Sequence, residues 1–403
     1  MGFTRSEPRR NANRLAEFLS LERNVLAVAS AMFLMALGEE LWKRFLPKYL
    51  EGLGAPVIAI GLFGTARDFL DGVYQYPGGW VADRYGRRSA LLLFVGIAAV
   101  GYAAYLTAPS WPFVFLGLGF AMAWTSMASP TLFAVVGDAL PKGRRAMGFT
   151  VQSILRRVPI VIAPALGGVA IASFGLRGGV RVGLCVSIAL AVVTAWVVSR
   201  VRIPVTMGGP VVGIRGVWSS LPTTLRRLLT SDIFIRTGEG LTDVFLVLYA
   251  TNVVGVSAAE FGALIGVQMA TAIVIYLPAA RLADRLGRKP FVIATFVAFA
   301  AFPVAVAVAT GMASLVLAFV IGGLREIGEP ARKALIVDLA EPHLRARSVG
   351  LYYLIRSLAI TPAAFVGGLL WNVAPPMPFY VAGAIGTLGT LVFALTVDED
   401  HTV

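Results

Sequence analysis

Charged side chains lie inside several long apolar runs of this chain. The first run holds Glu39 and Glu40, with Lys43 and Arg44 following at helical i,i+4 spacing. An ionisable side chain at membrane depth costs at least ~2.5–3.5 kcal/mol, so it should face a water-filled cavity or an oppositely charged partner. These residues are therefore candidates for chemistry inside a membrane.

Carboxylates are the side chains best placed to carry protons in these runs. The two histidines of the chain, His343 and His401, lie outside them. Burial favours the protonated form of a carboxyl group and a nearby arginine favours the ionised form, so a change of surroundings can load and release a proton. We expect this role for Glu39, Glu239 and Asp68.

A wider set of polar residues is expected to line a cavity for a substrate. Arginines bind anionic groups through paired hydrogen bonds and carboxylates bind cations, so the charge of the substrate stays open. Static ion pairs are the alternative, for example between Arg67 and Asp71 at i,i+4. The cavity candidates are Glu40, Arg67, Asp71, Gln152, Arg156, Asp243, Gln268, Arg325, Glu326, Glu329, Tyr352 and Arg356.

The elements that must position these side chains are membrane helices. Hydrophobic residues make up 57% of the 403-residue chain and charged residues only 14%, with a mean hydropathy of +0.78. Apolar runs of ~20 residues match the length of a helix that crosses a bilayer. They predict an all-α integral membrane protein with twelve transmembrane helices at roughly 24–46, 56–80, 89–107, 112–138, 147–173, 180–199, 232–254, 260–281, 290–310, 313–338, 348–372 and 378–396.

The second half of the chain repeats the first. Residues 79–88 (GWVADRYGRR) return as residues 280–289 (ARLADRLGRK), and pairs such as Pro130 with Pro330 match at nearly the same offset. A repeat on this scale indicates a duplicated helical unit. We expect two pseudo-symmetric six-helix bundles, residues 24–199 and 232–397.

Basic residues gather in the loops on one side of the predicted bundle. Under the positive-inside rule, both termini (1–23 and 398–403) and the linker (200–231) are cytoplasmic, and the chain is placed in the inner membrane of a cell. Topology then accounts for the net charge of +13, so we expect no nucleic-acid partner. The basic loop residues include Arg84, Arg87, Arg88, Lys142, Arg144, Arg145, Arg285, Arg288 and Lys289.

The repeated loop carries a specific pattern, G-x-x-x-D-R-x-G-R-R/K. The first copy is complete as Gly79, Asp83, Arg84, Gly86, Arg87 and Arg88, and the second keeps Asp284, Arg285, Gly287, Arg288 and Lys289. The second copy departs from the pattern at Ala280. With six plus six helices and a basic linker, this pattern resembles the major facilitator superfamily (MFS) of secondary transporters over nearly the whole chain.

The resemblance implies two six-helix halves that rock around a central cavity, with the repeated loops as part of a cytoplasmic latch. Glycine supports the tight turn of such a loop at Gly86 and Gly287. The loop carboxylates can accept hydrogen bonds from a helix N-terminus. We expect Asp138 and Asp338, which end the fourth and tenth helices, to join the latch.

Pro164, Gly167 and Gly168 in the fifth helix resemble the end of the antiporter motif of superfamily exporters. The alternative is that these residues only bend the helix and let it pack closely. Under the first reading, the motif points to export.

Other classes of function find little support in the sequence. There is no nucleophile elbow, phosphate-binding loop or metal-ligand spacing, and the single Cys185 cannot form an intramolecular disulfide. We expect no enzyme activity, no metal and no cofactor. The leading hypothesis is a proton-coupled antiporter that exports a small amphipathic compound or metabolite. An importer or uniporter of a small organic anion is the runner-up, followed by a non-transporting membrane sensor of the same fold. A monomer among membrane lipids is the superfamily default.

Overall fold

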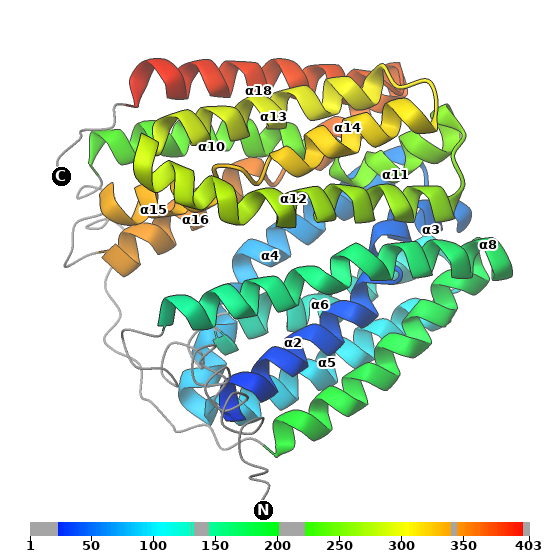
Figure 1. Ribbon diagram of the computed structural model, residues 1–403. Coiled ribbons are helices and arrows are strands. Elements are labelled where there is room, and N and C mark those ends of the chain that lie inside the picture. The colour runs from blue at the N-terminus through cyan, green and yellow to red at the C-terminus, as the bar shows by residue number, and fades with distance from the viewer. Residues whose placement is uncertain (1–22, 130, 133–144, 201–221, 340–344, 398–403) are drawn as a thin grey trace, which may run out of the picture.

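A computed structural model describes residues 23–129, 131–132, 145–200, 222–339 and 345–397. Within these ranges the chain is helical and contains no strand. The helices form two groups, α2 to α8 and α10 to α18, which lie side by side (Figure 1). We call the left and lower-left edge in Figure 1, where α8 ends and α10 begins, the linker side, and the opposite end the far side.

The first group contains the six helical segments of the N-terminal half. The first segment breaks after Glu40, and Gly175, at φ 72°, separates the fifth segment from the sixth inside α8. The elements are α2 (Arg23–Glu40), η1 (Lys43–Phe45), α3 (Leu46–Gly52), α4 (Val57–Tyr85), α5 (Arg87–Thr107), α6 (Trp111–Met122), η2 (Ala123–Met127) and α8 (Arg145–Ser199).

The second group contains the segments of the C-terminal half. Its first helix begins at Thr223 rather than at 232. The elements are α10 (Thr223–Thr242), η4 (Asp243–Phe245), α11 (Leu246–Leu248), η5 (Tyr249–Val254), α12 (Ala258–Leu286), α13 (Lys289–Ala307), α14 (Met312–Leu324), α15 (Glu329–Leu339), α16 (Arg345–Ile360), α17 (Ala363–Val373) and α18 (Met377–Thr396). Across the described ranges the predicted twelve-segment, all-helical fold is confirmed.

The breaks in the helices repeat along with the sequence. The 3₁₀ turns at residues 43–45 and 243–245 interrupt the first segment of each half. Gly86 and Gly287, at φ 83° and 89°, make the tight turns that end α4 and α12. Glycine tolerates a positive φ at no steric cost, so each long helix can reverse directly into the next.

The outer helices have the surface that a bilayer requires. By length and composition, six described helical stretches could cross a membrane, among them residues 87–107, 289–307 and 377–396. Large apolar side chains such as Leu116, Val192, Val274 and Leu395 are exposed on the outside. Buried charged residues lie on α2, α10 and α15, namely Glu39, Glu40, Asp232, Glu329 and Arg332.

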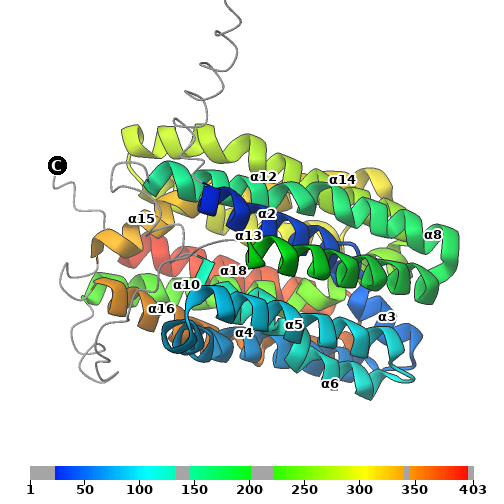
Figure 2. The same cartoon turned by 90° about the horizontal axis from the view of Figure 1, so that it is seen from below.

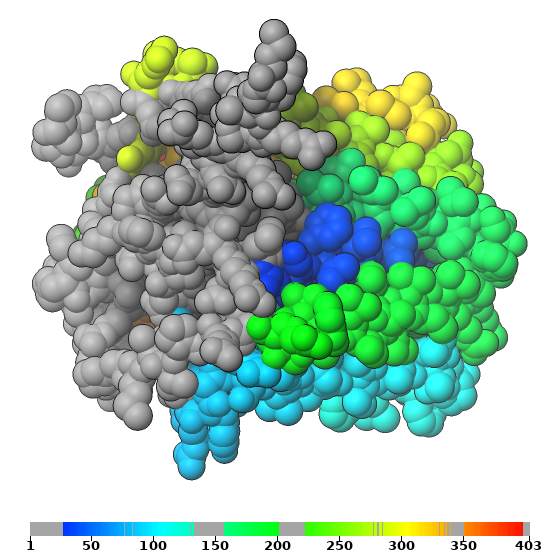
Figure 3. Space-filling view, turned by 60° about the horizontal axis from the view of Figure 1, so that its bottom comes forward, coloured from blue at the N-terminus to red at the C-terminus, as the bar shows by residue number. Residues whose placement is uncertain are grey.

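Contacts between the two groups gather on the far side. The first arm of α8 packs along α12, and α4 packs along α16 and α17 (Figures 1 and 2). The Phe45 and Phe261 rings meet edge to face, with centroids 5.8 Å apart, and both are almost fully buried. In Figure 3, α2 reaches the surface between the two arms of α8. The polar residues of α4 are thus held where the halves meet.

Candidate functional site

A cavity of about 520 Å³ lies between the two groups of helices. Its charged lining residues come from both halves. They are Lys43, Arg44, Arg67, Asp68 and Asp71 from the first half and Glu239 and Asp243 from the second. The remaining lining includes Phe63, Met122, Thr125, Val244, Leu246, Val247, Phe261 and Ile265.

Among the described residues, buried apolar side chains close the cavity on the far side, and exposure increases toward the linker side. Phe261 and Val247 at its far end are each only 1% exposed. Along α4, by contrast, Asp71 is exposed, and so is Gln75, one turn closer to the linker side. Charged groups thus face water at one end of the cavity while apolar groups seal the other.

Arg67 joins the two halves. Its Nη2 donates hydrogen bonds to Asp68 at 3.0 Å and to Asp243 at 2.9 Å, and Nη1 of Arg44 lies 4.0 Å from Asp243. The local Arg67–Asp71 ion pair expected from i,i+4 spacing is not formed, because Arg67 turns toward Asp243 of the other half. Asp71 instead accepts a 2.7 Å hydrogen bond from Ser126.

Glu239 lines the cavity from the second half and is held by two arginines. Nη1 of Arg236 lies 2.8 Å from one carboxylate oxygen, and Nη1 of Arg325 lies 3.3 Å from the other. The Arg325 guanidinium also stacks on Phe299 and Phe302. The Glu239 carboxylate is thus ion-paired inside the C-terminal half.

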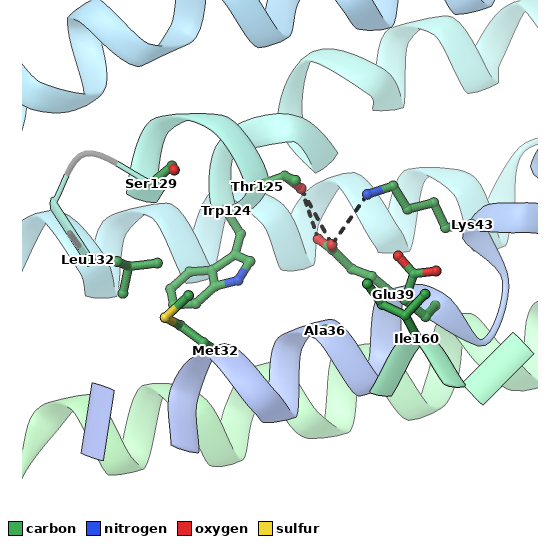
Figure 4. A pocket seen from close by; sticks show the side chains of 10 residues that line it. Met32, Ala36, Glu39, Lys43, Trp124, Thr125, Ser129, Leu132 and Ile160 are labelled. Carbon is green, nitrogen blue, oxygen red and sulfur yellow. Dashed lines mark hydrogen bonds and ion pairs between the residues drawn. The ribbon is translucent and has the colours of Figure 1, made fainter. Parts of the chain in front are cut away.

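Glu39 occupies a smaller pocket of about 80 Å³ beside the main cavity (Figure 4). Its carboxylate accepts hydrogen bonds from the Tyr102 hydroxyl at 2.5 Å and from Thr125 at 3.2 Å. Nζ of Lys43 is 3.9 Å away, across the break in the first segment. Lys43 and Thr125 line both spaces, so the pocket adjoins the main cavity.

The neighbouring Glu40 also faces this pocket and makes a close ion pair. Nε of Arg44 donates to its Oε2 at 3.1 Å, the i,i+4 pair expected from the sequence. Because Arg44 also lines the main cavity, this pair connects the two spaces.

A second bridge between the halves runs from α8 to the break between α14 and α15. Nη2 of Arg157 donates to Glu326 at 2.8 Å, and the guanidinium stacks on Tyr276 of α12. Gln268 lies on the same helix, where its backbone and side chain press against Gly322 and Gly323. Of these residues the sequence indicated Glu326 and Gln268 as cavity candidates and Arg157 as a charge inside the fifth apolar run.

Several expected cavity residues belong instead to a buried ion cluster inside the C-terminal half. Asp232 is 0% exposed, and one of its oxygens accepts from Arg332 at 2.6 Å, Tyr352 at 3.0 Å and Arg356 at 3.2 Å. Glu329 joins through Arg332 at 2.8 Å. The sequence analysis gave Asp232 no role. It predicted that the seventh segment begins at residue 232, which placed this carboxylate at the end of a helix.

The turn residues of the repeated loops lie on the linker side. Arg84 stacks on Trp80, and Arg88 donates to the carbonyl of Ser199 at 2.5 Å. No heavy atom lies within 4 Å of a Cβ built on Gly79, and Arg285 is exposed. Arg87 and Lys289 begin α5 and α13, with Arg288 at the α13 N-cap.

Six expected residues fall outside what the structure describes. For five of these residues only the helical backbone is described, and Asp138 lies wholly outside the described ranges. The five are Asp83, Gln152, Arg156, Asp284 and Asp338.

Glycines let the fifth segment approach its neighbours closely. A Cβ built on Gly167 would lie 1.9 Å from the Leu41 carbonyl oxygen, and one on Gly168 would lie 2.3 Å from that of Ala258 in the other half. In return, a Cβ built on Gly262 of α12 would lie 2.2 Å from the Pro164 carbonyl oxygen. Any larger residue would separate these helices.

Tyr102 and Ser126 are functional candidates that sequence reasoning missed. Neither carries a charge, and no charged residue in the middle of their apolar runs drew attention to them. The spacing of Tyr102 and Tyr105 in an otherwise apolar helix was the available signal. The Tyr102 and Tyr105 rings are almost fully buried and pack edge to face against Trp42.

Comparisons with known proteins agree with this architecture. The family model of the Major Facilitator Superfamily matches residues 28–237 and 228–403. The chain is 20% identical over 380 residues to an uncharacterized MFS-type transporter of Methanocaldococcus jannaschii, covering 92% of this chain and 94% of that protein. It is 28% identical over 174 residues to the quinolone resistance protein NorA of Staphylococcus aureus, covering 43% and 45%.

Among solved structures, a POT family transporter in complex with a thioalcohol-conjugated peptide has a TM-score of 0.78 at 14% identity. The match covers 94% of this chain and 97% of that one, and it shows a shared fold. The two matches to the family model correspond to the two groups of helices. This chain belongs to the major facilitator superfamily, and it is an integral multi-pass membrane transporter of a small-molecule substrate rather than an enzyme.

Proposed function

We propose that this transporter is a proton-coupled antiporter that exports a small amphipathic compound by alternating access. The observation that carries the proposal is the central cavity, where carboxylates of both halves meet in front of an apolar, closed far end. A charged lining beside an apolar one suits a compound that has both characters. The partial similarity to a quinolone resistance protein also supports export.

The surroundings of Glu39 suit a proton carrier. Its hydrogen-bond donors, Tyr102 and Thr125, are neutral, and among the described residues its basic neighbour is Lys43, at 3.9 Å. Protonation of Glu39 would remove its attraction for Lys43, and the Lys43 ammonium could then turn toward the main cavity, which it also lines. Asp68 and Glu239, by contrast, are bound to arginines, so either carboxylate would have to leave its partner before it took up a proton.

The orientation belongs to the same proposal. Basic residues such as Arg88, Arg227 and Arg285 lie at the linker side, which we place in the cytoplasm of a cell that holds the protein in its inner membrane. The cavity then faces the cytoplasm, the side from which an exporter loads its substrate. The proposal also takes the two six-helix bundles as the moving units, the repeated loops as their latch, and the monomer as the working form.

Transport in everted membrane vesicles tests the coupling. We expect added substrate to collapse an imposed pH gradient, read by a pH-sensitive dye, in the wild type. Glu39→Gln should abolish this response because an amide cannot bind the coupled proton, while downhill exchange of substrate continues. Glu260→Gln is the control, since Glu260 caps α12 away from the cavity and glutamine keeps that capping box.

Import or uniport of a small organic anion is the second candidate. Lys43, Arg44 and Arg67 line the cavity and could pair with a carboxylate group. Such a uniporter would move its substrate without any pH change in the vesicles, and Glu39→Gln would leave that flux intact. Substrate binding without any flux would favour a sensor over both transport modes.

A further inference from the structure

Asp71 differs from the other carboxylates of the central cavity in its partners. Its Oδ1 accepts a hydrogen bond from Ser126, and among the described residues no Lys or Arg nitrogen lies within ion-pair distance of it. Each of the others has an arginine. Asp68 lies 3.0 Å from Arg67, Asp243 lies 2.9 Å from Arg67, and Glu239 lies 2.8 Å from Arg236.

The basic groups of the cavity are already engaged by other carboxylates. Lys43 faces Glu39, Arg44 is bound to Glu40, and Arg67 bridges two aspartates. An exposed carboxylate with only a hydroxyl donor keeps its negative charge available to a ligand. Asp71 therefore gives the described part of the cavity an unmatched acceptor for a cation.

The far end of the cavity is apolar. Phe63 lies two helical turns from Asp71 on α4, about 12 Å at 1.5 Å per residue. Phe261 and Ile265 of α12 and Val247 of the seventh segment line the same closed end. A ligand that spans this distance would place one end on a carboxylate and the other among aromatic and aliphatic side chains.

We propose that the substrate is an amphipathic organic cation, whose positive group binds the Asp71 carboxylate while its apolar part lies against Phe63, Phe261 and Ile265. This inference names the substrate class of the export proposed above and rests on it for direction. Binding follows from charge attraction in a partly dehydrated cavity together with burial of apolar surface. The aromatic rings add an attraction for the cation itself.

Two ions of the same shape and opposite charge test this proposal. Tetraphenylphosphonium and tetraphenylborate would be bound to the purified full-length protein by equilibrium dialysis, without any gradient. We expect wild type to prefer the phosphonium. Asp71→Asn should weaken phosphonium binding at least tenfold, or about 1.4 kcal/mol. Asp71→Glu should restore most of it, and Glu260→Gln should change nothing.

A second measurement needs no variant and so avoids any folding defect. Carbodiimide labels the Asp71 carboxyl of the wild type, and mass spectrometry reads the extent of labelling. We expect tetraphenylphosphonium to slow labelling of Asp71 and tetraphenylborate to leave it unchanged. Equal phosphonium binding by wild type and Asp71→Asn, tighter binding of the borate, or labelling indifferent to both ions would overturn the proposal.

The outcomes separate this inference from proton coupling. Asp71-dependent phosphonium binding without any proton movement would contradict the antiport and leave the cation site standing. Proton exchange driven by neutral or anionic compounds, with no phosphonium binding, would leave the antiport standing and contradict the cation site.

Discussion

At the scale of single residues, the Asp232 cluster shows that a buried carboxylate needs basic and hydrogen-bonding partners. The Asp232 carboxylate has no exposed surface and is matched by Arg332, Tyr352 and Arg356 from the tenth and eleventh segments. Removal of one member leaves an uncompensated buried charge, which costs far more than the intact pair contributes. The cluster thus ties three helices of the C-terminal half into one unit.

Arg332→Ala should therefore lower the free energy of unfolding by about 3–5 kcal/mol. Lys333→Ala is the matched control, because Lys333 also faces Glu329, at 3.5 Å, but its side chain is 53% exposed. An exposed pair contributes about 0–1 kcal/mol. Unfolding of the purified proteins in detergent compares the two, and an equal loss in both would show that burial is not the cause.

At the scale of elements, the contact between α8 and α12 closes the far side. Carbonyl oxygens of each helix lie where a Cβ on the other would stand, at Gly168 and at Gly262. Helix pairs in membranes approach this closely only with small residues between them. Gly168 of the antiporter-like motif in the fifth segment therefore has a packing role, which is the alternative to a role in export.

Gly262→Ala should weaken this closure and favour a state open to the far side. A cysteine at Val247, which is buried at the closed end, reports the change through its reaction with a membrane-impermeant maleimide added on the far side. Cys185→Ser removes the native thiol of the background protein. Labelling should speed up with Gly262→Ala but not with Gly96→Ala, whose Cβ would meet no atom within 4 Å. No change with either variant would refute this role of α12.

At the scale of the whole molecule, ion pairs between described residues join the halves on either side of the cavity. Arg67 of α4 binds Asp243, and Arg157 of α8 binds Glu326. Both pairs are partly exposed, so each is expected to contribute only about 1 kcal/mol or less to stability. In the proposed alternating-access cycle their place between the two halves matters more than their strength, because the cycle must separate at least some cross-half contacts.

Exchange of one pair tests this connection between the halves. Arg157→Glu and Glu326→Arg alone should each slow substrate transport, since like charges would then face each other. The double exchange should recover part of the rate because an ion pair can form again in the reverse sense. Transport in reconstituted vesicles measures all four proteins. Strictly additive losses would show that the two residues act independently.

The sequence by itself determined the fold of this protein and the kind of residue at its centre. Apolar runs, the repeated loop and its glycines predicted twelve helices in two related halves, because these features depend on local spacing and on the length that a bilayer requires. Charged residues inside such runs predicted an interior cavity, because a charge at membrane depth must face water or an oppositely charged partner. Glu39, Glu40, Arg67, Asp68 and Asp71 do lie at the two cavities.

Only the tertiary structure decided which of these charges meet. Arg67 turns from the nearby Asp71 to Asp243 of the other half, and Tyr352 and Arg356 turn away from the cavity to Asp232. Partners so distant in sequence leave no spacing signal, since the crossing of helices alone brings them together. That Asp71 has no basic partner among the described residues follows only from the positions of the neighbouring charges in the folded structure.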